Sequence, residues 1–473
     1  MTRALAKRTA PRGGPPAPRA VPSTPRPSAT RVAPKISAAG ARSGDCVTIG
    51  VADASEVHSL GRPSELYGPG VVTYRPGVTL GALASLADAL GLRQLWLTPA
   101  ALEACGLPAD VGRRPYRVRH PFLEAPGRAV PEGQTALAPR LSCWGGGLAP
   151  FELLVPQWDA HSPWRALTYA PALLAELVDF TDATAMLWRG SGAVTSDAWL
   201  RTYYGKRLEP MDWPPPAEED LEPDLRTTRE PFPTEARARY LAAFDVNGMY
   251  LSAASSLALP AGQYVHRPPI EVVWRARPGY WHFAGRWVTT PTAAALAPGF
   301  PGAPGEVYDD AYAWLDYHRY LEPWYRTLRD GRERLLETGA GVALQALKAV
   351  YREGVGRFGS VNRTRERDPL YLPYWRQAVQ AEARTRLERH IAALGQAPVA
   401  VEVDCLYFLT NYRNPGLLAR GLGLTLGSGL GRFRFVGSAR ARDAREALAL
   451  PTLRERLACL RGLVSERGSD AAQ

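Results

Sequence analysis

The 473-residue sequence contains neither a long apolar run nor a pair of closely spaced cysteines. Because no stretch approaches 18 consecutive apolar residues, we predict no membrane span. The N-terminus has no apolar segment of the kind that a secretory signal needs, so we expect a cytoplasmic protein. The dispersed cysteines argue against a disulfide framework and against zinc; they are Cys46, Cys105, Cys143, Cys405 and Cys459. Any metal is therefore expected on carboxylates, which suit hard cations such as Mg²⁺.

Lysine is also scarce, since only four of the 57 basic residues are lysines. They are Lys7, Lys35, Lys206 and Lys348. This bias is typical of GC-rich coding, in which Arg replaces Lys wherever charge alone matters. A lysine that persists within a long folded segment, as Lys348 does, is therefore a candidate functional residue.

Residues 1–44 hold nine Lys or Arg and no acidic residue, so they account for most of the net charge of +11. They also contain eight prolines and many small residues, too little apolar surface to offset the entropy of ordering. We predict a disordered basic tail. It would attract phosphate backbones without sequence preference, or it would serve only as a solubilising leader.

From residue 45 to residue 210, short apolar runs alternate with amphipathic segments, which predicts a compact α/β domain. Buried strands are expected at 47–52, 93–98, 151–158 and 183–190, and helices at 77–90 and 172–183. Residues 211–234 combine six prolines with an acidic cluster, which is typical of a linker. Helices are then expected at 311–338, 342–355 and 374–394, and a single strand at 399–410.

Two acidic residues occupy apolar runs that are far apart in the sequence. Asp245 ends the run YLAAF, and Asp404 lies within PVAVEVDCLYFL, where strand alternation would place Glu402 on the same face. Either acid alone is most simply explained as a turn cap at a strand end. Together, two such carboxylates could bind a pair of divalent metals, which activates the attacking oxygen and stabilises the leaving oxygen in phosphoryl transfer.

Lys348 lies in the run LQALKAVYREGVGRF, which predicts a helix that ends at a Gly-x-Gly turn. Arg332 and Arg334 precede it on the neighbouring predicted helix. The simplest interpretation of these cations is a solvated basic face. Fixed cations that face two metal-binding carboxylates are also what a triphosphate requires, so we predict nucleotide binding by Lys348, Arg332 and Arg334.

Three segments in this order resemble the palm and fingers of family B DNA polymerases, the protein-primed branch especially. FDVNGMYL resembles the first palm motif, KAVYREGVGRF the fingers motif, and VEVDCLYF lies where the family has Asp-Thr-Asp-Ser. The resemblance implies that Asp245 and Asp404 are catalytic ligands of two Mg²⁺ ions, with Mn²⁺ as an alternative. It places Glu402 at the first acidic position of the last motif, Tyr250 beneath the sugar of the incoming dNTP, and Lys348 on its triphosphate.

The same resemblance implies single-stranded or primer-template DNA as the partner, with DNA contacts at Gly356, Arg357 and Arg384. It implies an α/β (α+β) fold, with an exonuclease-like (RNase H-like) N-terminal domain followed by a polymerase-like palm and fingers and a reduced thumb. The predicted boundaries are 1–44 for the tail, 45–210 for the exonuclease-like domain, 211–234 for the linker, 235–310 and 361–437 for the palm, 311–360 for the fingers and 438–473 for a short helical tail.

Several positions depart from the family pattern. Val355 stands where a tyrosine is expected, Arg352-Glu353 replace Asn-Ser, and Glu402 is longer than the usual aspartate. The N-terminal domain has no Asp-x-Glu on an early strand, so we expect no exonuclease activity. The basic tail, the front domain and FDVNGMYL also resemble, more loosely, the telomere-associated proteins of linear bacterial replicons, which implies a terminal protein as a further partner.

Three functions therefore remain open for a protein that we expect to be encoded by a bacterium, phage or plasmid. The first is a template-directed DNA polymerase that replicates a mobile or linear replicon. The second is a DNA-end-binding protein that keeps the polymerase fold without its activity. The third is a nuclease or transposase that uses the same carboxylates for hydrolysis.

Overall fold

A computed structural model of the chain describes the residues from 49 to 468, with gaps. The described ranges are 49–53, 55–59, 70–73, 80–107, 123–124, 140–145, 148–205, 211–219, 221–267, 277–283, 285–296, 309–360 and 368–468. The predicted disordered tail at 1–44 lies outside them. Backbone contacts divide the chain into residues 1–39 and residues 40–473, and all the described residues belong to the second unit.

The first part of the described chain folds around a seven-stranded mixed sheet with the strand order β3-β2-β1-β4-β7-β6-β5. Its central strands β1, β4 and β7 run parallel, and its other neighbours are antiparallel. The strands are β1 (Ile49–Ala52), β2 (Glu56–Ser59), β3 (Gly70–Thr73), β4 (Gln94–Leu97), β5 (Leu123–Glu124), β6 (Arg140–Gly145) and β7 (Leu148–Leu154). The helices are α1 (Leu80–Ala89), α2 (Pro99–Ala104), α3 (Ala170–Thr184) and α4 (Gly192–Tyr204). The mixed α/β character predicted for this region is confirmed.

The strand predicted at 183–190 is wrong. Helix α3 continues to Thr184, and Ala185 takes a left-handed conformation with a φ of 53°. The apolar residues that follow are buried by side-chain packing rather than by strand pairing. Trp188 packs edge-on against Trp164 and Phe180, with ring centroids 5.7 and 6.0 Å away.

A second, antiparallel sheet of five strands carries both predicted acidic residues. Its order is β18-β9-β17-β16-β8, which places the strand that contains Asp245 between two neighbours. The strands are β8 (Arg226–Thr228), β9 (Tyr240–Val246), β16 (Ala400–Glu402), β17 (Cys405–Thr410) and β18 (Phe433–Arg440). The helices α12 (Ala441–Leu448) and α13 (Leu453–Gly468) share one buried apolar cluster with this sheet.

The single strand predicted at 399–410 is a tight hairpin instead. Glu402 pairs directly with Cys405, so Val403 and Asp404 form a two-residue turn between β16 and β17. Val403 has a φ of 58°, a conformation that costs a β-branched residue free energy and that glycine normally fills in such turns. The sequence therefore carries no glycine signal for this turn.

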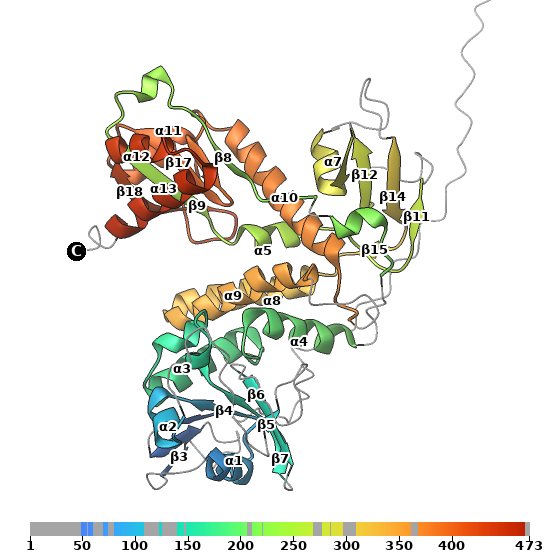
Figure 1. Ribbon diagram of the computed structural model, residues 1–473, viewed down its shortest axis with the longest axis vertical. Helices are drawn as coiled ribbons and strands as arrows, with labels where there is room; N and C mark the ends of the chain where they lie inside the picture. Colours follow the sequence, from blue (N-terminus) through green and yellow to red (C-terminus); the bar gives the residue numbers. More distant parts are fainter. Residues whose placement is uncertain are drawn as a thin grey trace, which may run out of the picture. The chain divides into compact units, whose positions relative to one another are not determined.

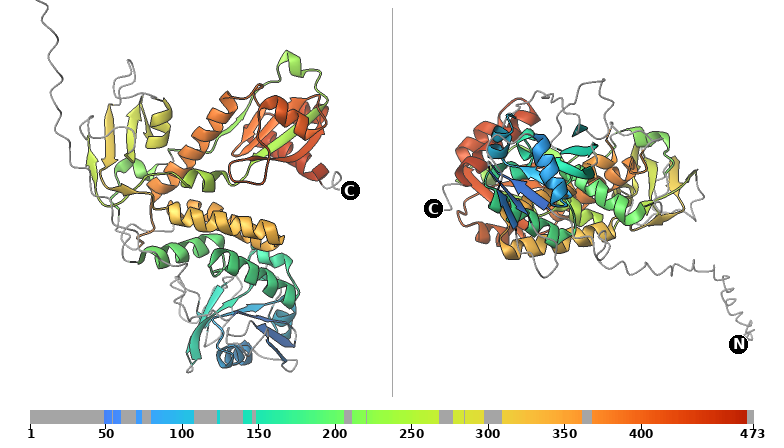
Figure 2. Two further views of the ribbon diagram at one scale, coloured as in Figure 1. Left: turned by 180° about the vertical axis from the view of Figure 1, so that it is seen from behind. Right: turned by 90° about the horizontal axis from the view of Figure 1, so that it is seen from below.

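Two smaller sheets and six further helices, of which α8, α9 and α10 are long, complete the described residues of the second part. The remaining strands are β10 (Leu259–Pro260), β11 (Tyr264–His266), β12 (Gly279–Phe283), β13 (Arg286–Thr289), β14 (Asp310–Trp314) and β15 (Tyr317–His318). The helices are α5 (Met249–Ala254), α7 (Thr290–Leu296), α8 (Glu322–Thr338), α9 (Gly341–Phe358), α10 (Pro373–Ala392) and α11 (Pro415–Leu422). α8 and α9 run side by side, and α4 packs along α9 (Figures 1 and 2).

The long helix predicted at 311–338 is correct only from residue 322. The first residues alternate between buried and half-buried positions and pair as strand β14, and α8 begins at Glu322 with Pro323 in its first turn. Proline is favoured in a first turn because its missing N–H needs no partner there. No described helix is long and apolar enough to cross a membrane.

Residues 211–234, predicted as a linker, pack against the body of the protein. Glu222 is fully buried and accepts hydrogen bonds from the backbone N–H and hydroxyl of Thr289 and from the hydroxyl of Thr292. Residues 226–228 form the edge strand β8. The prolines here belong to an irregular segment that packs on the fold, whereas the sequence had indicated a flexible linker.

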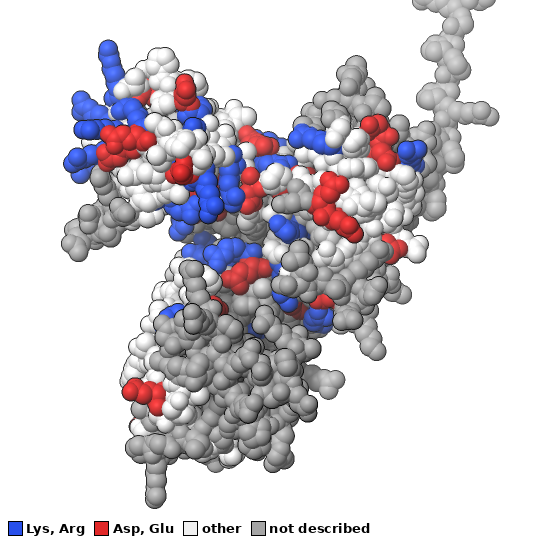
Figure 3. Space-filling model, in the orientation of Figure 1, with Lys and Arg blue, Asp and Glu red and all other residues white. Residues whose placement is uncertain are grey.

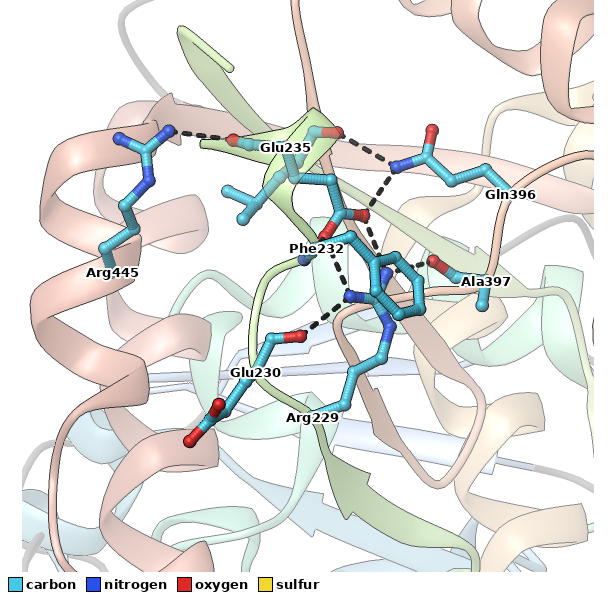
Figure 4. Close-up of polar contacts among 8 residues, drawn as sticks. Arg229, Glu230, Phe232, Glu235, Gln396, Ala397 and Arg445 are labelled. Atoms are coloured by element: carbon cyan, nitrogen blue, oxygen red, sulfur yellow. Dashed lines mark hydrogen bonds and ion pairs between the residues drawn. The ribbon is translucent and has the colours of Figure 1, made fainter. Parts of the chain in front are cut away.

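The end of this segment is held by a buried ionic network around Glu235 (Figure 4). Arg229 donates two hydrogen bonds to its carboxylate at 2.7 and 2.6 Å, and the Phe232 N–H and Gln396 donate two more. Arg445 donates to three backbone carbonyls of the same turn. Burial opposes ionisation of Glu235, but these donors outweigh it and hold the pKa of Glu235 below its ordinary value.

We predict that Glu235→Gln lowers the free energy of unfolding by about 2–3 kcal/mol, because Arg229 loses its counter-charge in a buried place. Urea denaturation measures the change. The matched control is Glu446→Gln, which removes an exposed partner of Arg442 and is expected to cost less than about 0.5 kcal/mol. Equal losses in the two variants would show that the Glu235 network does not stabilise the fold.

Candidate active site

Asp245 and Asp404 meet at one end of the five-stranded sheet. Asp245 is the penultimate residue of β9 and lies directly opposite Cys405, the residue after Asp404. The Val246 N–H donates to the backbone carbonyl of Asp404 at 3.0 Å, which fixes the hairpin turn against the end of β9. The two side chains are close enough for the charge of Asp245 to raise the pKa of Asp404. The structure thus brings together the two acids that the sequence singles out.

The contact between these carboxylates has an electrostatic cost. Burial, followed by the charge of Asp245 and the hydrogen bond to it, raises the pKa of Asp404 to about 7. Without a divalent cation, Asp404 therefore keeps its proton up to about pH 7. A divalent cation would replace that proton and remove the repulsion.

The residues around the pair fit a hard cation of the Mg²⁺ kind. Mg²⁺ is typically held by one or two carboxylates and completes its coordination with water and substrate phosphate oxygens. Asp245 and Asp404 supply two such carboxylates. Among the described residues, no group of three His, Cys, Asp or Glu could hold a metal, so phosphate oxygens would have to complete the set.

Arg434 is a further residue of the site, on the strand beside Asp245. It lies directly opposite Asp245 in the β9–β18 pairing, and both its Nε and one terminal nitrogen lie 2.7 Å from Asp245 Oδ2. Arg434 was not among the predicted site residues. Its position opposite Asp245 depends on strand register, which the sequence does not give.

The predicted nucleotide-binding cations Lys348 and Arg332 lie beside this ion pair. Burial and then the charges of Arg434 and Arg332 lower the pKa of Lys348, while Asp245 raises it. Arg332 is only 4% exposed, and its Nε has no hydrogen-bond partner within the described part of the chain. Lys348, Arg332 and Arg434 therefore form a cationic cluster next to the carboxylate pair. In the space-filling view, Lys and Arg side chains gather where the part with the five-stranded sheet faces α8 and α9 (Figure 3).

Two tyrosines, Tyr351 and Tyr250, lie near the carboxylate pair. Burial raises the pKa of Tyr351 to about 12, and the charges of Asp245 and Asp404 both reach it. Tyr250, which the resemblance places beneath the sugar, donates its hydroxyl to Asp224 Oδ1 at 2.6 Å. Burial and this hydrogen bond raise the pKa of Tyr250 well above its ordinary value, so its hydroxyl stays protonated. Asp224 comes from the segment predicted as a linker and was not among the predicted site residues.

Helix α9 carries Lys348 and is linked to α3 and α4 by two carboxylates. Each carboxylate accepts a backbone N–H from the first turn of the neighbouring helix. Glu176 of α3 accepts the Ala343 N–H in the first turn of α9 at 2.8 Å. Glu353 of α9 accepts the Ala193 N–H in the first turn of α4 at 3.2 Å. Acids are favoured at these ends because free N–H groups and the helix dipole face them. The departure from Asn-Ser at Arg352-Glu353 therefore has a structural role.

The Gly-x-Gly turn predicted at the end of this helix is wrong, because α9 continues to Phe358. Gly354 lies inside the helix, where a Cβ atom would come within 2.5 Å of Ser196 Oγ on α4. The glycine serves close helix packing rather than a turn. Val355, which replaces the expected tyrosine, is buried in the core.

Two predicted site residues lie away from the carboxylate pair. Glu402 forms an ion pair with Arg461 of α13, because the hairpin turn separates it from Asp404. Arg334 is exposed and donates to the backbone carbonyl of Asp182 at 3.3 Å. Arg332 and Arg334 are two residues apart on a helix and so face nearly opposite directions. The structure places only Arg332 in the site.

The predicted DNA contacts are placed in structural roles or on the surface. Arg384 donates to the buried Glu222 and, at 2.8 Å, to the Thr292 hydroxyl, so it holds the packed segment rather than facing an open surface. Arg357 forms an ion pair with Asp197 at 3.3 Å. Gly356 is exposed, with open space where a Cβ would lie.

Comparisons with known proteins give limited information. No family model and no curated protein matches the chain. Solved structures of Phi29 DNA polymerase are similar to it: the orthorhombic crystal form at 11% identity and a TM-score of 0.42, and the complex with primer-template DNA at 10% identity and 0.45. The ternary complex with incoming nucleotides gives 10% and 0.43. The alignments cover 84% of this chain and 85–86% of those chains, but TM-scores below 0.5 do not establish a common fold.

We predict that the metal-free protein becomes less stable as the pH rises from about 4 to about 7. In this window the folded state keeps a proton on Asp404 that the unfolded state, with a pKa near 3.9, has already lost. In Asp404→Asn this loss of stability disappears, because Asn does not titrate. Urea denaturation in EDTA at several pH values measures it.

The control for this experiment is Asp316→Asn, which removes an acid with a side chain 79% exposed. It should keep the wild-type pH dependence. If Asp404→Asn kept the wild-type pH dependence, Asp404 would not be the group that keeps a proton in the folded state.

Proposed function

We propose that the protein is a family B-like DNA polymerase that carries out template-directed nucleotidyl transfer. The observation that carries this proposal is the contact of Asp245 and Asp404 beside a cluster of three cations. Carboxylates and cations side by side match the chemistry of a nucleoside triphosphate bound with metal. The resemblance of FDVNGMYL and KAVYREGVGRF to palm and fingers motifs points the same way.

Different residues of the site would bind the metal, the triphosphate and the sugar. Asp245 and Asp404 would hold Mg²⁺ or Mn²⁺, which supplies activation of the attacking oxygen and neutralisation of the leaving oxygen. Lys348 and Arg332 would hold the triphosphate, since both present positive charge in a half-buried or buried place where it is poorly screened. Tyr250, held by Asp224, would limit the room beneath the sugar.

The substrates and setting follow from the same proposal. The partners would be primer-template or single-stranded DNA and dNTPs, with a terminal protein if the primer is a protein. Residues 45–210 would be an exonuclease-like domain without nuclease activity, which acts as the support for α9. Replication of a mobile or linear replicon in the cytoplasm is the setting that the resemblance favours.

A second candidate function, DNA-end binding without catalysis, is favoured by one specific feature. Arg434 neutralises Asp245, and Arg461 neutralises Glu402, so two of the three predicted acids already have arginine partners. A protein with this arrangement could bind nucleic-acid phosphates while holding no catalytic metal.

Primer extension with Mg²⁺ distinguishes the two candidates. The polymerase proposal predicts extension by the wild type and its loss in Asp404→Asn. DNA binding without extension in both proteins would instead support the end-binding function. Cleavage of a plasmid or hairpin in the absence of dNTPs, lost in Asp404→Asn, would point to a nuclease or transposase.

For the nucleotide site, we predict that Arg332→Ala lowers kcat/KM for dNTP about 10- to 100-fold, since a charged hydrogen bond contributes about 1.5–3 kcal/mol. Arg334→Ala is the matched control, because it removes the same group from the same helix on its exposed side. It should change kcat/KM less than about twofold. Steady-state primer extension at varied dNTP measures both, and equal effects would exclude Arg332 from the nucleotide site.

A further inference from the structure

Arg434 lies between a carboxylate that attracts it and two cations that repel it. On one side, its guanidinium contacts Asp245 through two nitrogens on a single carboxylate oxygen, Oδ2. On the other side are Lys348 and Arg332, whose charges it reaches. An arginine in this position neutralises a carboxylate and at the same time adds to a cluster of like charge.

The ion pair with Asp245 occupies an oxygen that a metal would need. A divalent cation at the carboxylate pair would meet a fixed positive charge 2.7 Å from Asp245 Oδ2, and like charges at such distances repel strongly. Metal binding through Oδ2 therefore requires that Arg434 leave or turn away. Its side chain is 54% exposed, so solvent gives it room to move.

The cationic cluster offers Arg434 an alternative partner once an anion is present. Arg332 is buried, and its Nε has no hydrogen-bond partner within the described ranges, so this cluster is short of negative charge. A phosphate group that binds Lys348 and Arg332 would draw the half-exposed guanidinium of Arg434 toward itself. Arg also binds phosphate oxygens through paired N–H groups, as it binds carboxylates.

We propose that Arg434 is an exchangeable counter-ion, which holds Asp245 when the site is empty and moves to a nucleotide phosphate when one binds, so that Asp245 becomes free for a divalent cation. The inference rests on the proposed function, because it assigns the anion to the nucleotide of that site. It makes binding of the nucleotide and of the metal mutually reinforcing, and the two effects are equal in size because coupling between two sites is reciprocal. A metal alone would then bind weakly.

A double-mutant cycle on metal-free nucleotide binding tests the exchange. The affinity for dATP is measured in EDTA by isothermal titration calorimetry for the wild type, Asp245→Asn, Arg434→Gln and the double variant. Asp245→Asn releases Arg434, so dATP affinity should rise about 10-fold. In the Arg434→Gln background the same change should raise it only about two- to threefold, because only long-range charge repulsion is removed.

Equal effects of Asp245→Asn in the two backgrounds would overturn the proposal, since independent charges act additively. Absence of measurable dATP binding to the wild type at millimolar concentration would overturn it as well, because the cationic cluster would then hold no nucleotide.

A second measurement does not depend on an Asp245 variant. Electron paramagnetic resonance of Mn²⁺ without nucleotide should show about 10-fold tighter binding to Arg434→Gln than to the wild type. The matched control is Arg442→Gln, which removes one exposed positive charge on α12 and should leave Mn²⁺ affinity unchanged. Unchanged affinity in Arg434→Gln would contradict the exchange.

These experiments test the Arg434 exchange and the polymerase function independently. If the cycle and the Mn²⁺ measurement give the expected results but the wild type extends no primer, the exchange stands and the polymerase function falls. If the wild type extends primers but Arg434→Gln behaves like Arg442→Gln in Mn²⁺ binding, the polymerase function stands and the exchange falls.

Discussion

The contact between the carboxylates of Asp245 and Asp404 is the constraint on which the rest of the site depends. The charge of Asp245 opposes ionisation of Asp404, and a protein keeps such a pair only where a ligand can stabilise both charges or where the surrounding fold enforces the contact. Here the fold enforces it through the backbone bond from Val246 to the carbonyl of Asp404. The strained φ of Val403 has the same origin, because the turn must direct Asp404 toward the end of β9.

The cations around the pair follow from the same constraint. Arg434, on the strand beside Asp245, offsets part of the repulsion between the two carboxylates. Lys348 and Arg332 come from α9 and α8, which pack against α5, the helix that follows β9. Of these helices, α9 is held against α3 and α4 by the caps that Glu176 and Glu353 provide and by close packing at Gly354. The N-terminal part therefore contributes to the position of Lys348 even though it supplies no residue to the carboxylate pair.

Much of this arrangement could be predicted from the sequence, and the reasons for the failures are physical. The strand before Asp245 is a short, nearly continuous apolar run, and α10 is a long run rich in helix-forming residues, so local sequence predicts both elements. The hairpin at Val403 could not be predicted, because a β-branched residue in a positive-φ turn contradicts every local turn preference. Gly354 was interpreted as part of a turn because its actual role, the close approach of α4, depends on a distant segment. The prolines of 211–234 indicated a linker because the burial of Glu222 depends on partners some 70 residues away.

The central claim is that Asp245 and Asp404 bind one common divalent cation, and localised cleavage by Fe²⁺ tests it most directly. Fe²⁺ bound in place of Mg²⁺, with ascorbate and peroxide, generates hydroxyl radicals that cut the backbone next to the metal. The account predicts cuts at both segments, near residues 245–248 and near residues 402–405, and the loss of both in Asp404→Asn. Cuts at only one of these segments, or cuts that persist in the variant, would contradict it.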